Sequence, residues 1–196
     1  MNGLETLILR NRLASAGFAP SVFHYPSTRA ALSEVTAALA AHVRALGEPV
    51  HLVGHSLGGL VIFETFETQG ELPPGRVVLL GSPVQGSRAA RAIAQWSFGP
   101  QLLGRLAATE LTRDQGRAWR WPREIGLIAG SRSAGMGRMF AELPEPNDGT
   151  ISVDETRLPG ATGHLVLEVS HTGMLLSAAV TDSLLKFLAS GSFGRQ

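Results

Sequence analysis

A serine stands between two glycines at the G-x-S-x-G spacing, in the run Gly54-His55-Ser56-Leu57-Gly58. An apolar run of strand length precedes it and a helical apolar pattern follows it, which is the sequence context of a nucleophile elbow. Such a turn is tight and strained, so the residues two places before and after the serine must be small. The Leu57 amide, at the positive end of the helix, would then face an oxyanion formed by attack of Ser56. A structural glycine turn is the alternative interpretation.

A serine nucleophile needs a general base, and the base needs a carboxylate that fixes its tautomer. In an open parallel sheet these groups come from loops at the carboxyl ends of different strands. Among the six histidines, only His171 follows the carboxyl end of a predicted strand after Ser56, whereas His55 lies inside the elbow and cannot turn back onto the serine. Asp148 follows the preceding predicted strand and is the candidate acid. Asp154 lies beyond that loop and is the alternative.

The elements that must position these residues alternate along the chain. Uninterrupted apolar runs predict strands, and apolar residues three and four apart predict helices. The alternation indicates an α/β fold with a mostly parallel sheet and helices on both faces. The predicted strands are 18–25, 49–54, 76–81, 124–130 and 163–169, and the predicted helices are 3–16, 27–46, 57–69 and 174–189.

The composition narrows the class of protein. The chain has 196 residues, of which 44% are hydrophobic and 17% charged, so a single domain over residues 1–196 is expected. A net charge of +1 argues against nucleic acid as a partner. There is no cysteine, and no sequence feature calls for a metal or an organic cofactor. No run approaches the ~18 apolar residues of a membrane span, and the start lacks signal-peptide features, so a cytoplasmic location is expected.

Residues 86–123 interrupt the alternation of strands and helices. A long insertion at the carboxyl end of a sheet most often carries function, and this one is predicted to be a helical lid over the site. We expect it to accept apolar acyl chains and to make peripheral contact with an anionic surface. The alternative is a helical hairpin whose arginines are only solvated. The aromatic residues are Trp96, Phe98, Trp119 and Trp121, and the basic residues are Arg88, Arg91, Arg105, Arg113, Arg117, Arg120 and Arg123.

Four signatures together resemble the α/β-hydrolases of the lipase and esterase type, over residues 1 to about 190. They are Gly54-His55-Ser56-Leu57-Gly58-Gly59, Leu80-Gly81-Ser82-Pro83-Val84-Gln85-Gly86-Ser87, Asn147-Asp148-Gly149-Thr150-Ile151 and Ser170-His171-Thr172-Gly173-Met174. The second is similar to the G-[ST]-P-x-x-G-S segment that opens the lid region in bacterial lipases. The order serine, aspartate, histidine is also that of the family. The resemblance implies ester hydrolysis in which Ser56 attacks, His171 transfers the proton, Asp148 orients His171 and the Leu57 amide stabilises the oxyanion.

The chain departs from the family pattern at its start. Family members have a central strand that ends in His-Gly and an oxyanion residue, just before the helix that is here residues 3–16. That strand normally lies between the strands expected at 18–25 and 49–54. The second oxyanion donor would then be missing, unless Met1 or Asn2 supplies it.

A missing central strand has consequences for stability. The two flanking strands would pair directly, a strand from another molecule would fill the gap, or the chain would be marginally folded, because unpaired buried backbone groups are costly. We therefore expect residues 1–196 alone to be poorly stable and weakly active, and an upstream segment that ends in His-Gly to raise both properties.

Two classes of function follow. The first is a serine hydrolase that cleaves a small-molecule or lipid ester through an acyl-enzyme on Ser56. The second is a catalytically impaired protein of the same fold that binds an acyl ligand or a partner. A thioesterase or amidase would use the same three residues, so the fold alone does not choose between these reactions.

Overall fold

The computed structural model describes residues 4–26, 30–47, 49–95, 111, 116–133 and 143–194. At its centre lies a parallel sheet of four strands in the spatial order β1-β2-β3-β4. Because all neighbouring pairs are parallel, the carboxyl ends of the strands meet along one side of the sheet, here termed the carboxyl edge. The strands are β1 Leu52–His55, β2 Val77–Leu80, β3 Ile125–Gly130 and β4 Gly163–Leu167.

The two central strands, β2 and β3, are buried along their whole length. Strands covered on both faces need apolar side chains at every position, and this explains their uninterrupted apolar sequences. The register places Val77 opposite Leu52 on one side and opposite Ile125 on the other. The predicted α/β architecture with a mostly parallel sheet is therefore confirmed.

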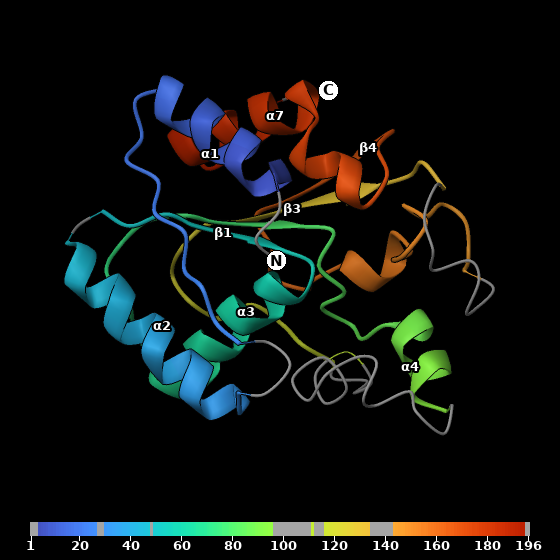
Figure 1. Ribbon diagram of the computed structural model, residues 1–196, viewed down its shortest axis with the longest axis horizontal. Coiled ribbons are helices and arrows are strands. Elements are labelled where there is room, and N and C mark those ends of the chain that lie inside the picture. The colour runs from blue at the N-terminus through green and yellow to red at the C-terminus, as the bar shows by residue number, and fades with distance from the viewer. Residues whose placement is uncertain are drawn as a thin grey trace.

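Helices cover both faces of the sheet (Figure 1). On one face lie α1 (Leu4–Ser15) and α7 (Ala178–Ser190), and on the other lie α2 (Leu32–Leu46) and α3 (Leu57–Gln69). The short α4 (Arg88–Ala94) follows β2.

Each pair of helices closes a separate hydrophobic core against the sheet. Phe66 of α3 and Leu79 of β2 belong to one core, and Phe187 of α7 and Leu80 of β2 belong to the other. Neighbouring residues of β2 thus point to opposite faces, as the alternation along a strand requires.

The strand predicted at 18–25 does not form, and this prediction is wrong. The segment connects α1 to α2 and passes from one face of the sheet to the other (Figure 1). Phe18 packs against the α1 core, whereas Phe23 and Tyr25 pack against the α2 core. Crossing between the faces therefore buries the apolar residues that suggested a strand, and Pro20 cannot donate a hydrogen bond to a neighbouring strand.

Direct pairing of 18–25 with the elbow strand, one of the three outcomes considered for a missing central strand, is absent as well. Within the described ranges, β1 pairs only with β2. The crossing segment comes close just before β1 begins, where the ring centroids of Phe18 and His51 lie 5.8 Å apart. The expected low stability stays a prediction.

Two helices differ from the predicted ones by more than one residue, whereas α1 agrees to within one residue at each end and the elbow helix spans 57–69 as predicted. The helix predicted from residue 27 begins at Leu32, and residues 27–29 lie outside the described residues. The predicted final helix over 174–189 is divided into a 3-10 turn, η3 (Thr172–Leu175), and α7. The division occurs because Ser177 caps α7, its Oγ accepting a hydrogen bond from the Val180 amide at 3.3 Å.

The predicted lid is only partly described, since residues 96–110 and 112–115 lie outside the described residues. In the part that is described, Trp119 and Trp121 pack on α3, with 5.0 Å between the ring centroids of Trp119 and Phe66 and 5.7 Å between those of Trp121 and Phe63. Arg123 donates to backbone carbonyls that precede β2, on the side of the sheet opposite the carboxyl edge. Of residues 116–123, Arg117 and Trp119 are buried and Trp121 packs against the α2 and α3 core, whereas Gly116, Arg120 and Pro122 are exposed. A lid over the site, formed by residues 86–123, stays a prediction. Contact of the other arginines with an anionic surface stays a prediction.

Candidate active site

Ser56 occupies a sharp turn between β1 and α3. Its φ of 54° and ψ of −124° make it the one non-glycine residue with positive φ in the described part of the chain. Its amide donates to the carbonyl of Leu80, and its own carbonyl accepts from the Gly59 amide, at 2.9 and 3.0 Å. A strained serine at the end of a buried strand and the start of a helix is the geometry of a nucleophile elbow.

The glycines around the turn have different roles. A Cβ on Gly54 would stand 2.7 Å from the Gly59 backbone, and one on Gly59 would collide with the Ser82 side chain. These two glycines allow α3 to approach β1 and the end of β2. A Cβ on Gly58 would meet nothing within 4 Å. The expectation that Gly58 must be small is therefore wrong, and Gly59 carries that requirement.

Gly58 and Gly59 thus form a matched pair for a stability test. We expect Gly59→Ala to lower the free energy of unfolding by about 1–3 kcal/mol, because the Ser82 side chain must shift in a packed interior. Gly58→Ala should leave stability unchanged or raise it by up to ~1 kcal/mol, because alanine favours a helix more than glycine does. Urea unfolding followed by circular dichroism would measure both, and equal stabilities would contradict this account.

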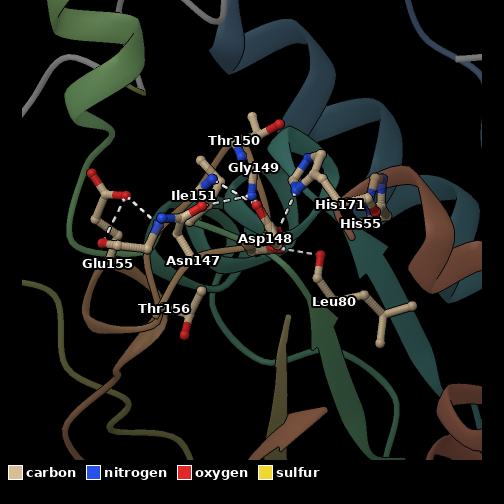
Figure 2. Close-up of polar contacts among 12 residues, drawn as sticks. His55, Leu80, Asn147, Asp148, Gly149, Thr150, Ile151, Glu155, Thr156 and His171 are labelled. Atoms are coloured by element: carbon tan, nitrogen blue, oxygen red, sulfur yellow. Dashed lines mark hydrogen bonds and ion pairs between the residues drawn. The ribbon is translucent and has the colours of Figure 1, made fainter. Parts of the chain in front are cut away.

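The predicted base and acid meet beyond the ends of β3 and β4. His171 Nδ1 lies 2.7 Å from Asp148 Oδ2, and the His171 amide donates to the Asp148 carbonyl at 3.0 Å (Figure 2). The Asp148 side chain is 1% exposed and that of His171 is 13% exposed. A buried carboxylate on Nδ1 places the proton of a neutral ring there and leaves Nε2 as an acceptor.

The Asp148 carboxylate is fixed by its own loop. Oδ1 accepts the amides of Thr150 and Ile151, at 2.9 and 2.7 Å, which leaves Oδ2 for His171. Asn147 holds the loop from the other side, because its Oδ1 accepts from the Ser133 hydroxyl and from the Gly149 amide, both at 2.9 Å. The sequence Asn-Asp-Gly therefore builds a turn that aims one carboxylate oxygen at the histidine.

Two further glycines bring the loops together. A Cβ on Gly81, which follows β2, would stand 3.2 Å from His171 Nδ1, and one on Gly130, the last residue of β3, would stand 2.7 Å from Asp148 Cβ. The sequence analysis did not single out either position as part of the site. The signal was that each glycine directly ends a buried strand at the carboxyl edge.

Ser56 and His171 face the same edge, although no hydrogen bond joins Ser56 Oγ to His171 in the described residues. Such bonds are often long before a substrate is bound. Leu57 is the first residue of α3, so its amide has no acceptor within the helix. Met1 and Asn2, the candidates for a second oxyanion donor that was otherwise expected to be missing, lie outside the described residues.

His55 also has a contact in the site that sequence reasoning missed. Its Nε2 lies 3.0 Å from the backbone carbonyl oxygen of His171, and the two ring centroids are 4.7 Å apart (Figure 2). Burial of the ring, together with the positive charge that His171 can carry, lowers the pKa of His55 to about 4. His55 is therefore neutral near pH 7.

No group of three or more histidine, aspartate or glutamate side chains is placed to hold a metal ion in the described part of the chain. None of its described helices is long and apolar enough to cross a membrane.

The fold and the site together define an α/β-hydrolase. The sequence profile described as the alpha/beta hydrolase family matches residues 6–188, so the chain belongs to this family. No protein with a curated function matches the chain.

Several solved structures share the fold at low sequence identity. The mature form of Bacillus licheniformis lipase BlEst2 is 22% identical, with a TM-score of 0.64 over 87% of this chain and 78% of that one. The metagenomic carboxyl esterase MGS0156 is 18% identical, with a TM-score of 0.67 over 83% of this chain. Paleococcus ferrophilus monoacylglycerol lipase is 16% identical, with a TM-score of 0.58 over 94% of this chain and 88% of that one. The chain spans 57% of the metagenomic esterase and 42% of the propeptide form of the Bacillus lipase.

Proposed function

We propose that the protein is a serine hydrolase that cleaves carboxylic esters through an acyl-enzyme on Ser56. In this proposal His171 is the general base and acid, Asp148 orients His171, and the Leu57 amide is one donor of the oxyanion hole. The substrate is a small-molecule or lipid ester, and the reaction uses no cofactor.

One observation carries the proposal. A buried carboxylate lies 2.7 Å from His171 Nδ1, and both groups stand at the same edge of the sheet as a serine with φ of 54° at the start of a helix. If the turn were only structural, its serine would not need a strained backbone. If the pair of Asp148 and His171 were only structural, it would not need to lie at the same edge of the sheet as that serine.

The chemistry follows from these positions. As Ser56 Oγ attacks the ester carbonyl carbon, its proton moves to His171 Nε2, and the carbonyl oxygen becomes an oxyanion beside the Leu57 amide. Collapse of this intermediate breaks the bond to the alcohol, which takes the proton from His171 as it leaves. A water molecule, deprotonated by His171, then attacks the acyl-enzyme and releases the acid and free Ser56.

The solved structures of similar fold favour an ester over other acyl compounds as the substrate. The structures of similar fold include a lipase, a carboxyl esterase and a monoacylglycerol lipase. At 16–22% identity these likenesses concern the fold, so the choice of an ester rests on analogy and needs a direct test.

The competing hypothesis is an impaired hydrolase that only binds an acyl ligand. The test is to treat the protein with a fluorophosphonate, which reacts covalently with activated serines, and to measure its mass. We expect one adduct per chain, located on Ser56 by peptide mapping and absent from Ser56→Ala, together with turnover of p-nitrophenyl butyrate. A folded protein that neither takes up the label nor hydrolyses the ester would contradict the proposal. Faster cleavage of a matched thioester would identify the substrate class as a thioester and not an ester.

A further inference from the structure

The side chain that precedes Ser56 touches the backbone of His171. His55 is the last residue of β1, and its ring lies beside that of His171, tilted by 44° (Figure 2). His55 Nε2 lies at hydrogen-bond distance, 3.0 Å, from the carbonyl oxygen of His171. This contact joins the turn that holds the serine directly to the loop that holds the histidine.

The direction of the hydrogen bond follows from its partner. A carbonyl oxygen can only accept, so His55 Nε2 carries the proton and donates. His55 Nδ1 then carries the lone pair, and this atom is inaccessible to solvent, with no hydrogen-bond partner among the described residues. A second proton on Nδ1 would have no acceptor there, which agrees with the lowered pKa of His55. The ring therefore remains a neutral donor with a fixed tautomer.

The remaining hydrogen bonds of His171 hold it to a different part of the site. Its amide donates to the Asp148 carbonyl, and its Nδ1 bonds the Asp148 carboxylate. These bonds fix His171 relative to the acid loop but not relative to Ser56. Among the described residues, the hydrogen bond from His55 is the one that joins His171 to the elbow.

We propose that His55 is a positioning residue, which holds His171 at the working distance from Ser56 by donating its Nε2 proton to the His171 carbonyl. The inference rests on the proposed function, because it assigns His55 a task in the same reaction. A displacement of reacting groups by about 1 Å can cost up to ~100-fold in rate. A donor attached to the residue next to the nucleophile limits such a displacement, since the elbow and the base loop can then move only together.

Glutamine and asparagine at position 55 form a matched pair for the test. A glutamine side chain can place its NH2 group near the position of His55 Nε2, whereas that of asparagine is one methylene shorter and ends near the position of Nδ1. Both variants keep a polar amide of modest size, so they differ mainly in whether a donor reaches the His171 carbonyl.

The experiment measures kcat and KM for p-nitrophenyl butyrate, and the rate of fluorophosphonate labelling, in wild type, His55→Gln and His55→Asn. We expect His55→Asn to lower kcat and the labelling rate by roughly 10- to 100-fold, with KM changed by less than about threefold. His55→Gln should recover most of both rates. Urea unfolding of each variant checks that the protein is folded under the conditions in which the rates are compared.

Several results would overturn the inference. If the wild type is labelled and active while His55→Asn has the same kcat, the hydrogen bond does not position His171, although the proposed function stands. If His55→Gln is as slow as His55→Asn, the ring itself matters and not its donor. A rise in KM at constant kcat would assign His55 to substrate binding. A wild type without label or activity would overturn the proposed function itself.

Discussion

Replacing Ser56 by alanine is expected to lower kcat for p-nitrophenyl butyrate on the order of 10⁶-fold, and His171→Ala by a similar factor. Without the hydroxyl no acyl-enzyme forms, and without the imidazole the hydroxyl stays protonated at neutral pH. Asp148→Asn should cost about 10⁴-fold, because an amide that donates to His171 Nδ1 would favour the wrong tautomer. Stopped assays at high enzyme concentration would measure the residual rates.

The double variant separates a working unit from independent contributions. If Ser56, His171 and Asp148 act together, Ser56→Ala/His171→Ala should be hardly slower than either single variant. A multiplied loss in the double variant would mean that the two residues act independently, and would contradict the triad.

Asp154→Asn is the matched control for the acid. Asp154 Oδ1 pairs with Arg157 Nε at 3.1 Å on the surface, and the Asp154 side chain is 76% exposed. Its replacement should leave kcat within about twofold, since it is absent from the set of groups around His171. Normal activity in Asp148→Asn together with loss in Asp154→Asn would transfer the role of the acid to Asp154.

The elbow and its partners were predictable because their signals are local. Gly54 marks a close approach of β1 to α3 that leaves no room for a side chain, and the structure places Ser56 at φ of 54°. Asp148 and His171 each follow a buried strand, and parallel strands deliver such residues to one edge. The contact between Asp148 and His171 thus follows from topology, without any knowledge of side-chain packing.

The segment 18–25 could not be assigned correctly from its own pattern. Its apolar residues suit a strand, but the same residues are buried equally well when the chain crosses between two cores. What decides the outcome is whether a neighbouring backbone is available for pairing, and this is a property of the whole fold. Pro20 was the one local signal against a strand.

The close contacts within the site could not be predicted either, because they too depend on the whole fold. His55 was set aside because it cannot reach Ser56, yet its ring contacts a loop more than 100 residues away in sequence. Gly81 and Gly130 matter because a side chain would press against His171 or Asp148. A single sequence does not reveal which residues meet across strands, so these contacts required the structure.

Arg117 shows how charge alone can mislead. In the sequence it is one of several arginines in the predicted lid, where a solvated or lipid-facing position is expected. In the structure its side chain is 2% exposed and lies beside Glu64 of α3, with 2.9 Å between Nη2 and Oε1 and 3.2 Å between Nε and Oε1. Its Nη1 donates to the Val84 carbonyl, and its guanidinium lies 5.6 Å from the centre of the Phe63 ring. Arg117 therefore ties residues 116–123 to α3.

Breaking this pair from one side is expected to destabilise the protein strongly. In Arg117→Met the Glu64 carboxylate, 14% exposed, would keep its charge without the guanidinium that neutralises it. Removing one partner of a buried ion pair costs about 3–5 kcal/mol, a large share of the ~5–15 kcal/mol that stabilises a typical domain. Urea unfolding at pH 7 would measure the loss as a lower midpoint with an unchanged slope.

Two further variants decide whether the loss comes from the unpaired charge. Arg157→Met removes an exposed pair, with side chains 63% and 76% exposed, and should cost less than about 1 kcal/mol. The double variant Arg117→Met/Glu64→Leu removes both charges and should regain much of the stability, because a well-packed apolar pair often replaces a buried ion pair at little cost. If Arg117→Met costs no more than Arg157→Met, the pair adds nothing to stability. If instead the double variant is as unstable as Arg117→Met, the loss does not come from the unpaired charge of Glu64 but from contacts of the Arg117 side chain, which include those with the Val84 carbonyl and the Phe63 ring.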